Sequence, residues 1–219
     1  MVALAIVSAC GDEGSAGDAR VAQAREAALD AGLPADVADF IGNLARAADA
    51  TYQASYPDGT GGNIVVVSSD PPRVRVDVVN GVDIDRSQIR LDDRAYACGR
   101  TETGAGEPGP LSCERTAIDV VVPTEFSTAA MGALTDSLAE RADAYRFDLV
   151  TREVAGMTAD CLRIARRAEA DDTVGGPGGE ICANDDGVVL AATEGDTTFE
   201  VTDYGPAVPD GAFDLPEGG

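Results

Sequence analysis

The sequence contains no histidine and no lysine, and each absence removes a class of function. Without histidine, the chain lacks the commonest general base, the usual partner of a serine or cysteine nucleophile, and the commonest ligand of transition metals. Without lysine, all 16 basic residues are arginine, and 39 acidic residues bring the formal net charge to −23. This charge argues against a nucleic-acid partner and against electrostatic docking on anionic lipid. We therefore expect a protein that is not an enzyme and that uses no cofactor and no metal.

The length and the hydrophobic content predict a folded chain with a real core. The sequence has 219 residues, of which 44% are hydrophobic, so it is not a disordered chain despite its charge. We find no linker of the kind that separates domains and no internal repeat. The expected organisation is a single α+β domain over residues 19–219.

The first fifteen residues resemble a bacterial lipoprotein signal. Residues 1–9 are apolar but too short to span a bilayer, which takes about 20 residues. They end in the small-residue site Val7-Ser8-Ala9-Cys10, and an acidic, glycine- and serine-rich segment follows. We interpret residues 1–9 as the signal, Cys10 as the lipidated residue and residues 10–18 as a flexible tether. The protein is then exported and anchored by lipid to the outer face of the cell membrane. The alternative is a buried N-terminal strand with a core cysteine.

Hydrophobic periodicity changes along the chain from the helical to the strand period. Helices are predicted over residues 19–31 and 35–50, and a longer internal helix over residues 125–144. Arg73-Val74-Arg75-Val76-Asp77-Val78 alternates charge and valine, which indicates a strand with one wet and one dry face. Four further strands are predicted over residues 64–67, 84–91, 94–99 and 117–122. The last third of the chain is predicted to form a β-meander with strands over residues 145–154, 159–168, 180–183, 187–193 and 197–203.

Four cysteines remain once Cys10 is assigned to lipid, and three pairings of four cysteines are possible. Proximity in the sequence favours Cys98 with Cys113 and Cys161 with Cys182. Each pair encloses a loop rich in glycine and proline, which a disulfide would restrain, and an exported location permits such bonds. A zinc site made of four thiolates is the alternative, but the sequence has no CxxC spacing.

Three other sequence patterns are better explained by a structural role than by a catalytic or ligand-binding site. The glycine-rich run 175–179 lacks the Lys-Ser/Thr that follows in a phosphate loop, so we interpret it as a turn. Residues 184–187 are too few for a calcium loop and occur where a hairpin turn is expected. Carboxylate pairs such as Asp92-Asp93 and Asp171-Asp172 are expected to be solvated in a chain this acidic, although a carboxylate-based hydrolase is kept as a third hypothesis.

The order of elements resembles the LolA/LppX-like superfamily of exported lipid carriers and sensors. The resemblance is based on element order, on the Pro71–Asp77 strand, on the Val154–Cys161 segment and on Phe213-Asp214-Leu215-Pro216. The resemblance covers residues 35–217. Within the superfamily, the chain is especially similar to actinobacterial lipoproteins that carry extra cysteine pairs. It implies a curved antiparallel half-barrel sheet with helices packed on its concave side and an apolar cavity between them.

The alternation along the strands and the spacing along the helix predict which residues line this cavity. For each of them, ordinary core packing is the alternative. The candidates are Val74, Val76, Val78, Phe126, Met131, Leu134, Leu138, Phe147, Leu149, Leu162 and Ile164.

Two hypotheses of function follow. In the first, a membrane-anchored, non-enzymatic lipoprotein of the cell envelope binds a lipid or another hydrophobic ligand in this cavity. In the second, the same fold serves as a protein-interaction or sensing module without bound lipid, and it then carries an apolar patch on its surface.

Overall fold

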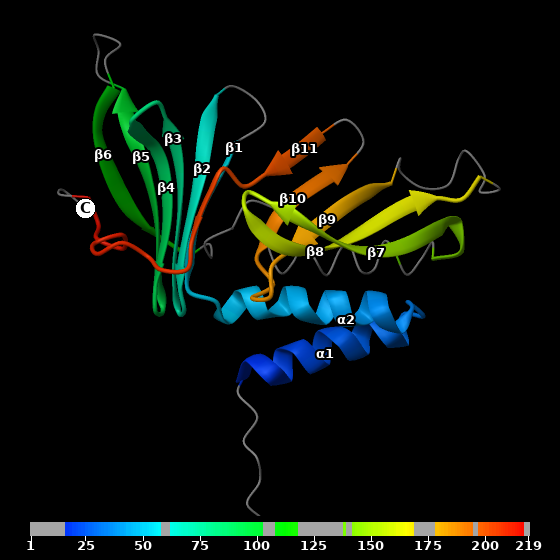
Figure 1. Cartoon of the computed structure of the whole chain (residues 1–219). Coiled ribbons are helices and arrows are strands. Elements are labelled where there is room, and N and C mark those ends of the chain that lie inside the picture. Colours follow the sequence, from blue (N-terminus) through cyan, green and yellow to red (C-terminus); the bar gives the residue numbers. More distant parts are fainter. Residues whose placement is uncertain are drawn as a thin grey trace, which may run out of the picture.

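Two short helices precede all the strands in the computed structural model, which describes residues 16–57, 62–102, 108–117, 138, 142–168, 178–194 and 197–216 (Figure 1). Helix α1 (Ala16–Asp30) ends before Gly32, whose φ of 83° reverses the chain. Helix α2 (Ala35–Leu44) starts after Pro34 and continues into the 3₁₀ helix η1 (Ala45–Asp49). Both helices were predicted, but residues 16–18, expected at the end of the tether, are helical.

Seven strands form a first sheet, sheet A, whose order is β12-β1-β2-β3-β4-β5-β6. Every neighbouring pair is antiparallel, and β1 to β6 follow one another along the chain as a meander. The Asn80-Gly81 turn lies between β3 and β4 as expected, with a φ of 63° at the glycine. The strands are β1 (Tyr52–Pro57), β2 (Asn63–Asp70), β3 (Arg73–Asn80), β4 (Asp83–Leu91), β5 (Arg94–Glu102), β6 (Pro108–Thr116) and β12 (Asp203–Gly205).

Five strands form a second antiparallel sheet, sheet B, whose order is β11-β10-β9-β8-β7. It corresponds to the predicted C-terminal meander, and β7 has the predicted bounds. The strands are β7 (Tyr145–Val154), β8 (Met157–Arg166), β9 (Gly179–Ala183), β10 (Val189–Glu194) and β11 (Thr197–Glu200). Figure 1 shows α1 and α2 lying along sheet B, while sheet A stands beside it.

The chain passes from one sheet to the other between two consecutive residues. The Val201 amide donates to the Leu190 carbonyl of β10 at 2.7 Å, whereas the Thr202 amide donates to the Ser55 carbonyl of β1 at 2.8 Å. The predicted strand 197–203 is therefore divided into β11, which belongs to sheet B, and β12, which belongs to sheet A. The fold is antiparallel α+β as expected, but it contains two sheets where the resemblance implies one.

The internal helix predicted over residues 125–144 lies mostly outside the described residues. Leu138 is described and is buried at 4% exposure, and Ala142–Ala144 form the short 3₁₀ helix η3 that leads into β7. The predictions for Phe126, Met131 and Leu134 fall outside the described residues.

Two clusters of buried apolar side chains hold these elements together. The first, which we call the helix-side core, joins α1 and α2 to one face of sheet B. It contains Ala28, Leu33, Val37, Ala38, Phe40, Ile41, Leu44, Leu138, Ala144, Tyr145, Leu162, Ile164, Ile181, Ala183 and Val189. The second, the inter-sheet core, joins sheets A and B. It contains Tyr52, Ala54, Tyr56, Val67, Val74, Val76, Val154, Ala159, Cys161, Cys182, Val188, Leu190, Ala191 and Val201.

Candidate functional site

Over β1, β2 and β3, one face of sheet A is largely apolar, and this face carries the first three predicted cavity residues. Cross-strand partners share a face, and side chains alternate along each strand. The registers therefore place Tyr52, Ala54, Tyr56, Val65, Val67, Val74, Val76 and Val78 on one side of β1, β2 and β3, which we call the valine face. Val74 and Val76 are buried, at 7% and 6% exposure, and they contribute to the inter-sheet core. Val65 and Val78, which are cross-strand partners, are only half-buried.

The candidates from sheet B lie elsewhere. Leu162 and Ile164 are buried in the helix-side core, against which Phe147 packs from β7. Leu138 belongs to the same core. The structure therefore divides the described candidates between two cores and does not gather them around one space.

Leu149 is the exception, because 39% of it is exposed. It lines a groove of about 370 Å³ between α2 and the β7–β8 hairpin, together with Phe40. The rest of the lining is largely polar: Asp36, Asp39, Asn43, Thr151 and Asp160. All three carboxylates already have partners: Asp36 accepts from the Val37 amide at 3.0 Å, Asp39 from Arg25 at 2.5 Å and Asp160 from the Thr151 hydroxyl at 2.9 Å.

Both disulfides join directly opposed residues of neighbouring strands, as predicted. Cys98 of β5 pairs with Cys113 of β6, and Cys161 of β8 pairs with Cys182 of β9, each with Cα atoms 4.0 Å apart. One disulfide lies in each sheet, so the alternative of a single four-thiolate zinc site is wrong. The Glu180 carboxylate lies within 4.8 Å of both the Cys161 and Cys182 sulfurs. This carboxylate forms ion pairs with Arg152 at 3.0 Å and with Arg163 at 2.6 Å, so we interpret Glu180 as an ion-pair partner of these arginines.

Three tyrosines connect the two sheets at the end of the valine face. The Tyr56 hydroxyl donates to the Val189 carbonyl of β10 at 2.8 Å. Tyr52 stacks on Tyr204 of β12 with ring centroids 6.2 Å apart, and the Tyr204 hydroxyl accepts from the Asn184 amide at 3.0 Å. Burial raises the pKa of Tyr52 to about 12, and the neighbouring Tyr204 acts in the same direction. Burial also raises the pKa of Tyr56 above its ordinary value.

These tyrosines predict a loss of stability in alkaline solution. An unfolded tyrosine ionises near pH 10, so the folded state disfavours tyrosinate and its advantage is complete below about pH 10. We expect the free energy of unfolding to fall as the pH rises from 10 toward 12, measured by urea unfolding at fixed pH. Tyr52→Phe should flatten this dependence. The expectation fails if all five tyrosines absorb as tyrosinate near pH 10 while the protein stays folded.

The turn between β9 and β10 is the hairpin turn that the sequence predicts. The Asn184 side chain accepts from the Val188 amide at 2.9 Å, and the Asn184 carbonyl accepts from the Asn43 side chain at 3.0 Å. Gly187 has a φ of 75°, and a Cβ there would lie 2.1 Å from the Asn43 carbonyl oxygen of α2. Only glycine fits between this turn and the end of α2.

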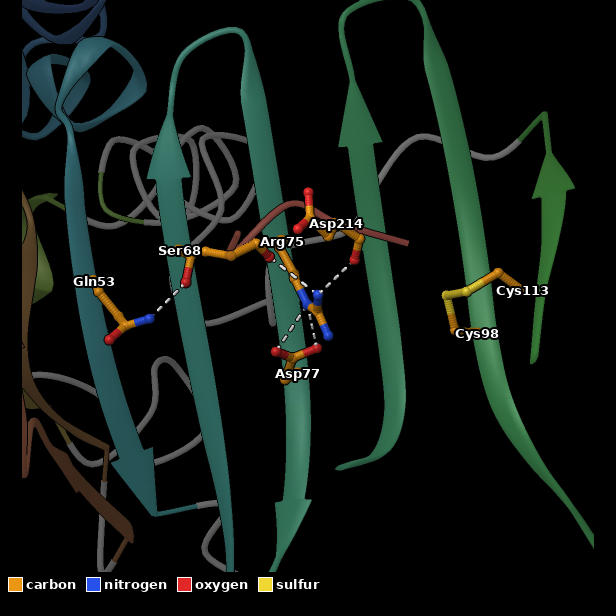
Figure 2. A network of polar contacts seen from close by, with 8 residues as sticks. Gln53, Ser68, Arg75, Asp77, Cys98, Cys113 and Asp214 are labelled. Carbon is orange, nitrogen blue, oxygen red and sulfur yellow. Dashed lines mark hydrogen bonds and ion pairs between the residues drawn. A yellow bond between two sulfur atoms is a disulfide. The ribbon is translucent and has the colours of Figure 1, made fainter. Parts of the chain in front are cut away.

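The opposite face of sheet A, which we call the polar face, holds a buried ion pair that sequence reasoning missed (Figure 2). The Arg75 Nε donates to both Asp77 carboxylate oxygens, at 2.8 and 2.9 Å. Its Nη1 donates to the carbonyls of Ala212 and Asp214, at 3.0 and 3.2 Å. Both charged side chains are nearly buried, at 10% and 12% exposure. The wet face predicted for β3 is therefore wrong, because the C-terminal segment, residues 206–216, lies over it.

Further polar groups continue along the same face. In Figure 2 the side chains of Gln53 and Ser68 lie on the same side of the sheet as Arg75, and the Gln53 amide donates to Ser68 at 2.9 Å. Ser87 is 2% exposed, and its hydroxyl has no partner within the described residues. The guanidinium of Arg73 stacks over the Phe213 ring at 4.6 Å and adds a second attachment for the C-terminal segment.

The fold and the cysteines define a class of protein in coarse terms. It is an antiparallel α+β protein with two disulfides, which suggests an oxidising, extracytoplasmic environment. Among the described residues, neither helix is long and apolar enough to span a membrane. The sequence matches no protein-family model and no curated protein.

Proposed function

We propose that this protein is a cell-envelope lipoprotein, anchored through Cys10, that binds a lipid or another hydrophobic ligand against the valine face. The two sheets would then form the two parts of a half-barrel of the LolA/LppX kind. The observation that carries the proposal is the largely apolar character of this face across β1, β2 and β3, where Ser69 is a buried polar member between Tyr52 and Val74. Its outer members Val65 and Val78 remain half-buried, while its inner members are packed.

The joint between the sheets supports the proposed half-barrel. Val201 bonds to sheet B and Thr202 bonds to sheet A, so the chain itself links the edge strand β11 of one sheet to the edge strand β12 of the other. A sheet that bends at one such joint has a concave side, on which apolar surface is sheltered from water.

The distribution of exposed apolar residues favours a ligand over a protein partner. An interaction module should display a contiguous apolar patch. Within the described ranges, the large apolar side chains that are more than a third exposed belong to four separate elements or turns: Leu29, Ile64, Val82 and Leu149. Scattered single residues of this kind are normal on any protein surface.

A binding assay on the full chain tests the ligand. Dansyl-undecanoic acid, a fluorescent fatty acid, is expected to bind saturably with a blue-shifted emission. Val78→Gln, which puts an amide on the valine face, should weaken binding about tenfold. Val79→Gln is the matched control, because Val79 is the next residue of β3, equally half-buried but on the polar face. Equal affinities for the two variants would contradict the proposed site, and a stable protein partner without bound lipid would favour the interaction module.

The lipid anchor is tested separately. Radiolabelled palmitate is expected to label the protein in an exporting bacterium and to leave Cys10→Ser unlabelled. Label retained by Cys10→Ser would contradict lipidation at this residue.

A further inference from the structure

An open cleft of about 710 Å³ lies at one end of sheet A, away from the residues of the valine face that the ligand proposal uses. Its lining includes three arginines from three successive strands: Arg90 at the end of β4, Arg94 at the start of β5 and Arg115 near the end of β6. The remaining lining residues are Asp92, Asp93, Ala95, Thr116 and Ala117. Three arginines among the eight lining residues that the structure describes is a high density in a chain with 16 basic and 39 acidic residues.

Two of the three arginines, Arg94 and Arg115, are weakly neutralised by the described residues. Arg115 is exposed, and its side chain has no ion pair or hydrogen bond in the described part of the chain, although acidic residues are more than twice as numerous as arginines. Arg94 is 3.8 Å from Asp93, whose side chain is 88% exposed, so this contact is long and solvated. The Nε of Arg90 donates to the Pro72 carbonyl at 3.2 Å, which holds its guanidinium at the end of the sheet.

The strand registers show how the cleft relates to the two faces of sheet A. Arg90, Ala95 and Thr116 are cross-strand neighbours that continue the row of Val74 on the valine face. Arg94 and Arg115 belong to the opposite face, so the cleft wraps around the end of the sheet. A ligand group held there lies next to the apolar surface.

The same end of the sheet lies close to the start of the described chain. Arg20 in α1 pairs with Asp49 at 2.6 Å, just before β1, and the Thr51 hydroxyl donates to Asp70 at the end of β2 at 3.2 Å. Figure 1 shows the start of α1 and the β2–β3 and β4–β5 turns toward the lower side of the molecule. A chain anchored at Cys10 would therefore hold the cleft toward the membrane.

We propose that this cleft binds the phosphate group of an anionic ligand, which deepens the proposed function by assigning the headgroup end of a phospholipid. A planar guanidinium matches two phosphate oxygens, and three of them suit a group with several anionic oxygens. The net charge of −23 does not prevent this, because at physiological ionic strength distant carboxylates are screened beyond about 8 Å whereas the arginines contact the anion.

Calorimetric titration of the full chain carrying Cys10→Ser, at physiological ionic strength, tests the site with two probes. Inorganic phosphate reports the anion site alone, and dihexanoyl phosphatidic acid, used below its micellar concentration, reports headgroup and chains together. Both are expected to bind, with phosphatidic acid at least tenfold tighter. Equal affinities would assign the site to free phosphate and overturn the lipid headgroup. Absence of saturable binding of either probe at millimolar concentration would overturn the site itself.

Variants connect the binding to the cleft. Arg115→Gln is expected to weaken phosphate binding at least tenfold, and Asp93→Asn should strengthen it two- to threefold by removing a competing carboxylate. Arg86→Gln is the matched control, because Arg86 is an exposed arginine of β4 that does not line the cleft. An equal loss in Arg86→Gln and Arg115→Gln would overturn the assignment. Val78→Gln should leave inorganic phosphate binding unchanged, so the cleft and the apolar site can fail independently.

Discussion

Replacing Cys161 and Cys182 together by alanine is expected to lower the free energy of unfolding by about 3 kcal/mol. The bond joins residues 21 apart, and the entropy that such a closed loop removes from the unfolded chain corresponds to about this value. Both cysteines are also fully buried, so the lost sulfurs leave a void in the inter-sheet core. Urea unfolding followed by circular dichroism measures the change.

The other disulfide provides a matched comparison. Cys98 and Cys113 are 15 residues apart, so their entropic contribution is similar, but Cys113 is only half-buried and its loss leaves a smaller void. We expect the Cys98→Ala, Cys113→Ala variant to lose slightly less stability. Unchanged unfolding midpoints in both double variants would show that these bonds do not restrain the unfolded chain.

Replacing Asp77 by alanine is the second change with a large expected effect, a loss of about 3 kcal/mol. The buried Arg75 guanidinium would keep its bonds to the Ala212 and Asp214 carbonyls but lose its carboxylate partner. An uncompensated buried charge is much more costly than the absence of the pair. The double variant Arg75→Met, Asp77→Leu should therefore be more stable than Asp77→Ala alone.

The chain supplies a control with the same spacing. Arg146 and Asp148 of β7 are also two residues apart on one strand, with Nε and Oδ2 3.0 Å apart, but their side chains are 67% and 46% exposed. Asp148→Ala is expected to cost less than about 1 kcal/mol, as surface pairs usually do. Similar losses for Asp77→Ala and Asp148→Ala would mean that the Arg75 pair is solvated in solution.

The C-terminal segment gives a second readout for Arg75. Its guanidinium binds this segment through two backbone carbonyls, so Arg75→Met should speed proteolytic cleavage between residues 206 and 216. Arg146→Met is the control and should leave the cleavage rate unchanged. Equal cleavage rates in all three proteins would show that other contacts, such as Arg73 with Phe213, hold the segment.

Local patterns predicted most described strands, and the clearest were those with one apolar face, such as β3. The alternation in Arg73–Val78 placed Val74, Val76 and Val78 on the same side of β3, which the register confirms. The same alternation failed for Arg75 and Asp77, since a local pattern carries no information about a segment more than 130 residues away that covers them. Strand β6 (Pro108–Thr116) was missed, because the proline and glycine at its start are typical of loops. The predicted strand 117–122 lies, apart from Ala117, outside the described residues.

The candidate site shows the same limit. Periodicity identified buried apolar residues, and Leu162 and Ile164 are buried as core packing requires. It could not assign them to a sheet, because that depends on the crossing at Val201 and Thr202. The arginine cleft was missed because Arg90, Arg94 and Arg115 are separated in sequence by turns and a loop, and only strand pairing brings them together.

The crossing at Thr202 also sets the order in which the chain can finish folding as it is made or exported. The Ser55 carbonyl of β1 accepts hydrogen bonds from Thr202, which is 147 positions later in the chain. The outer edge of β1 can therefore be paired only after almost the whole chain has been made. Until then β1 is an open edge able to pair with other chains. Contacts this distant in sequence form slowly. A chain truncated before residue 202 would keep residues that join the two sheets, such as Tyr56 and Val189, but would lack the bonds of Thr202 and β12 that close the edge of β1.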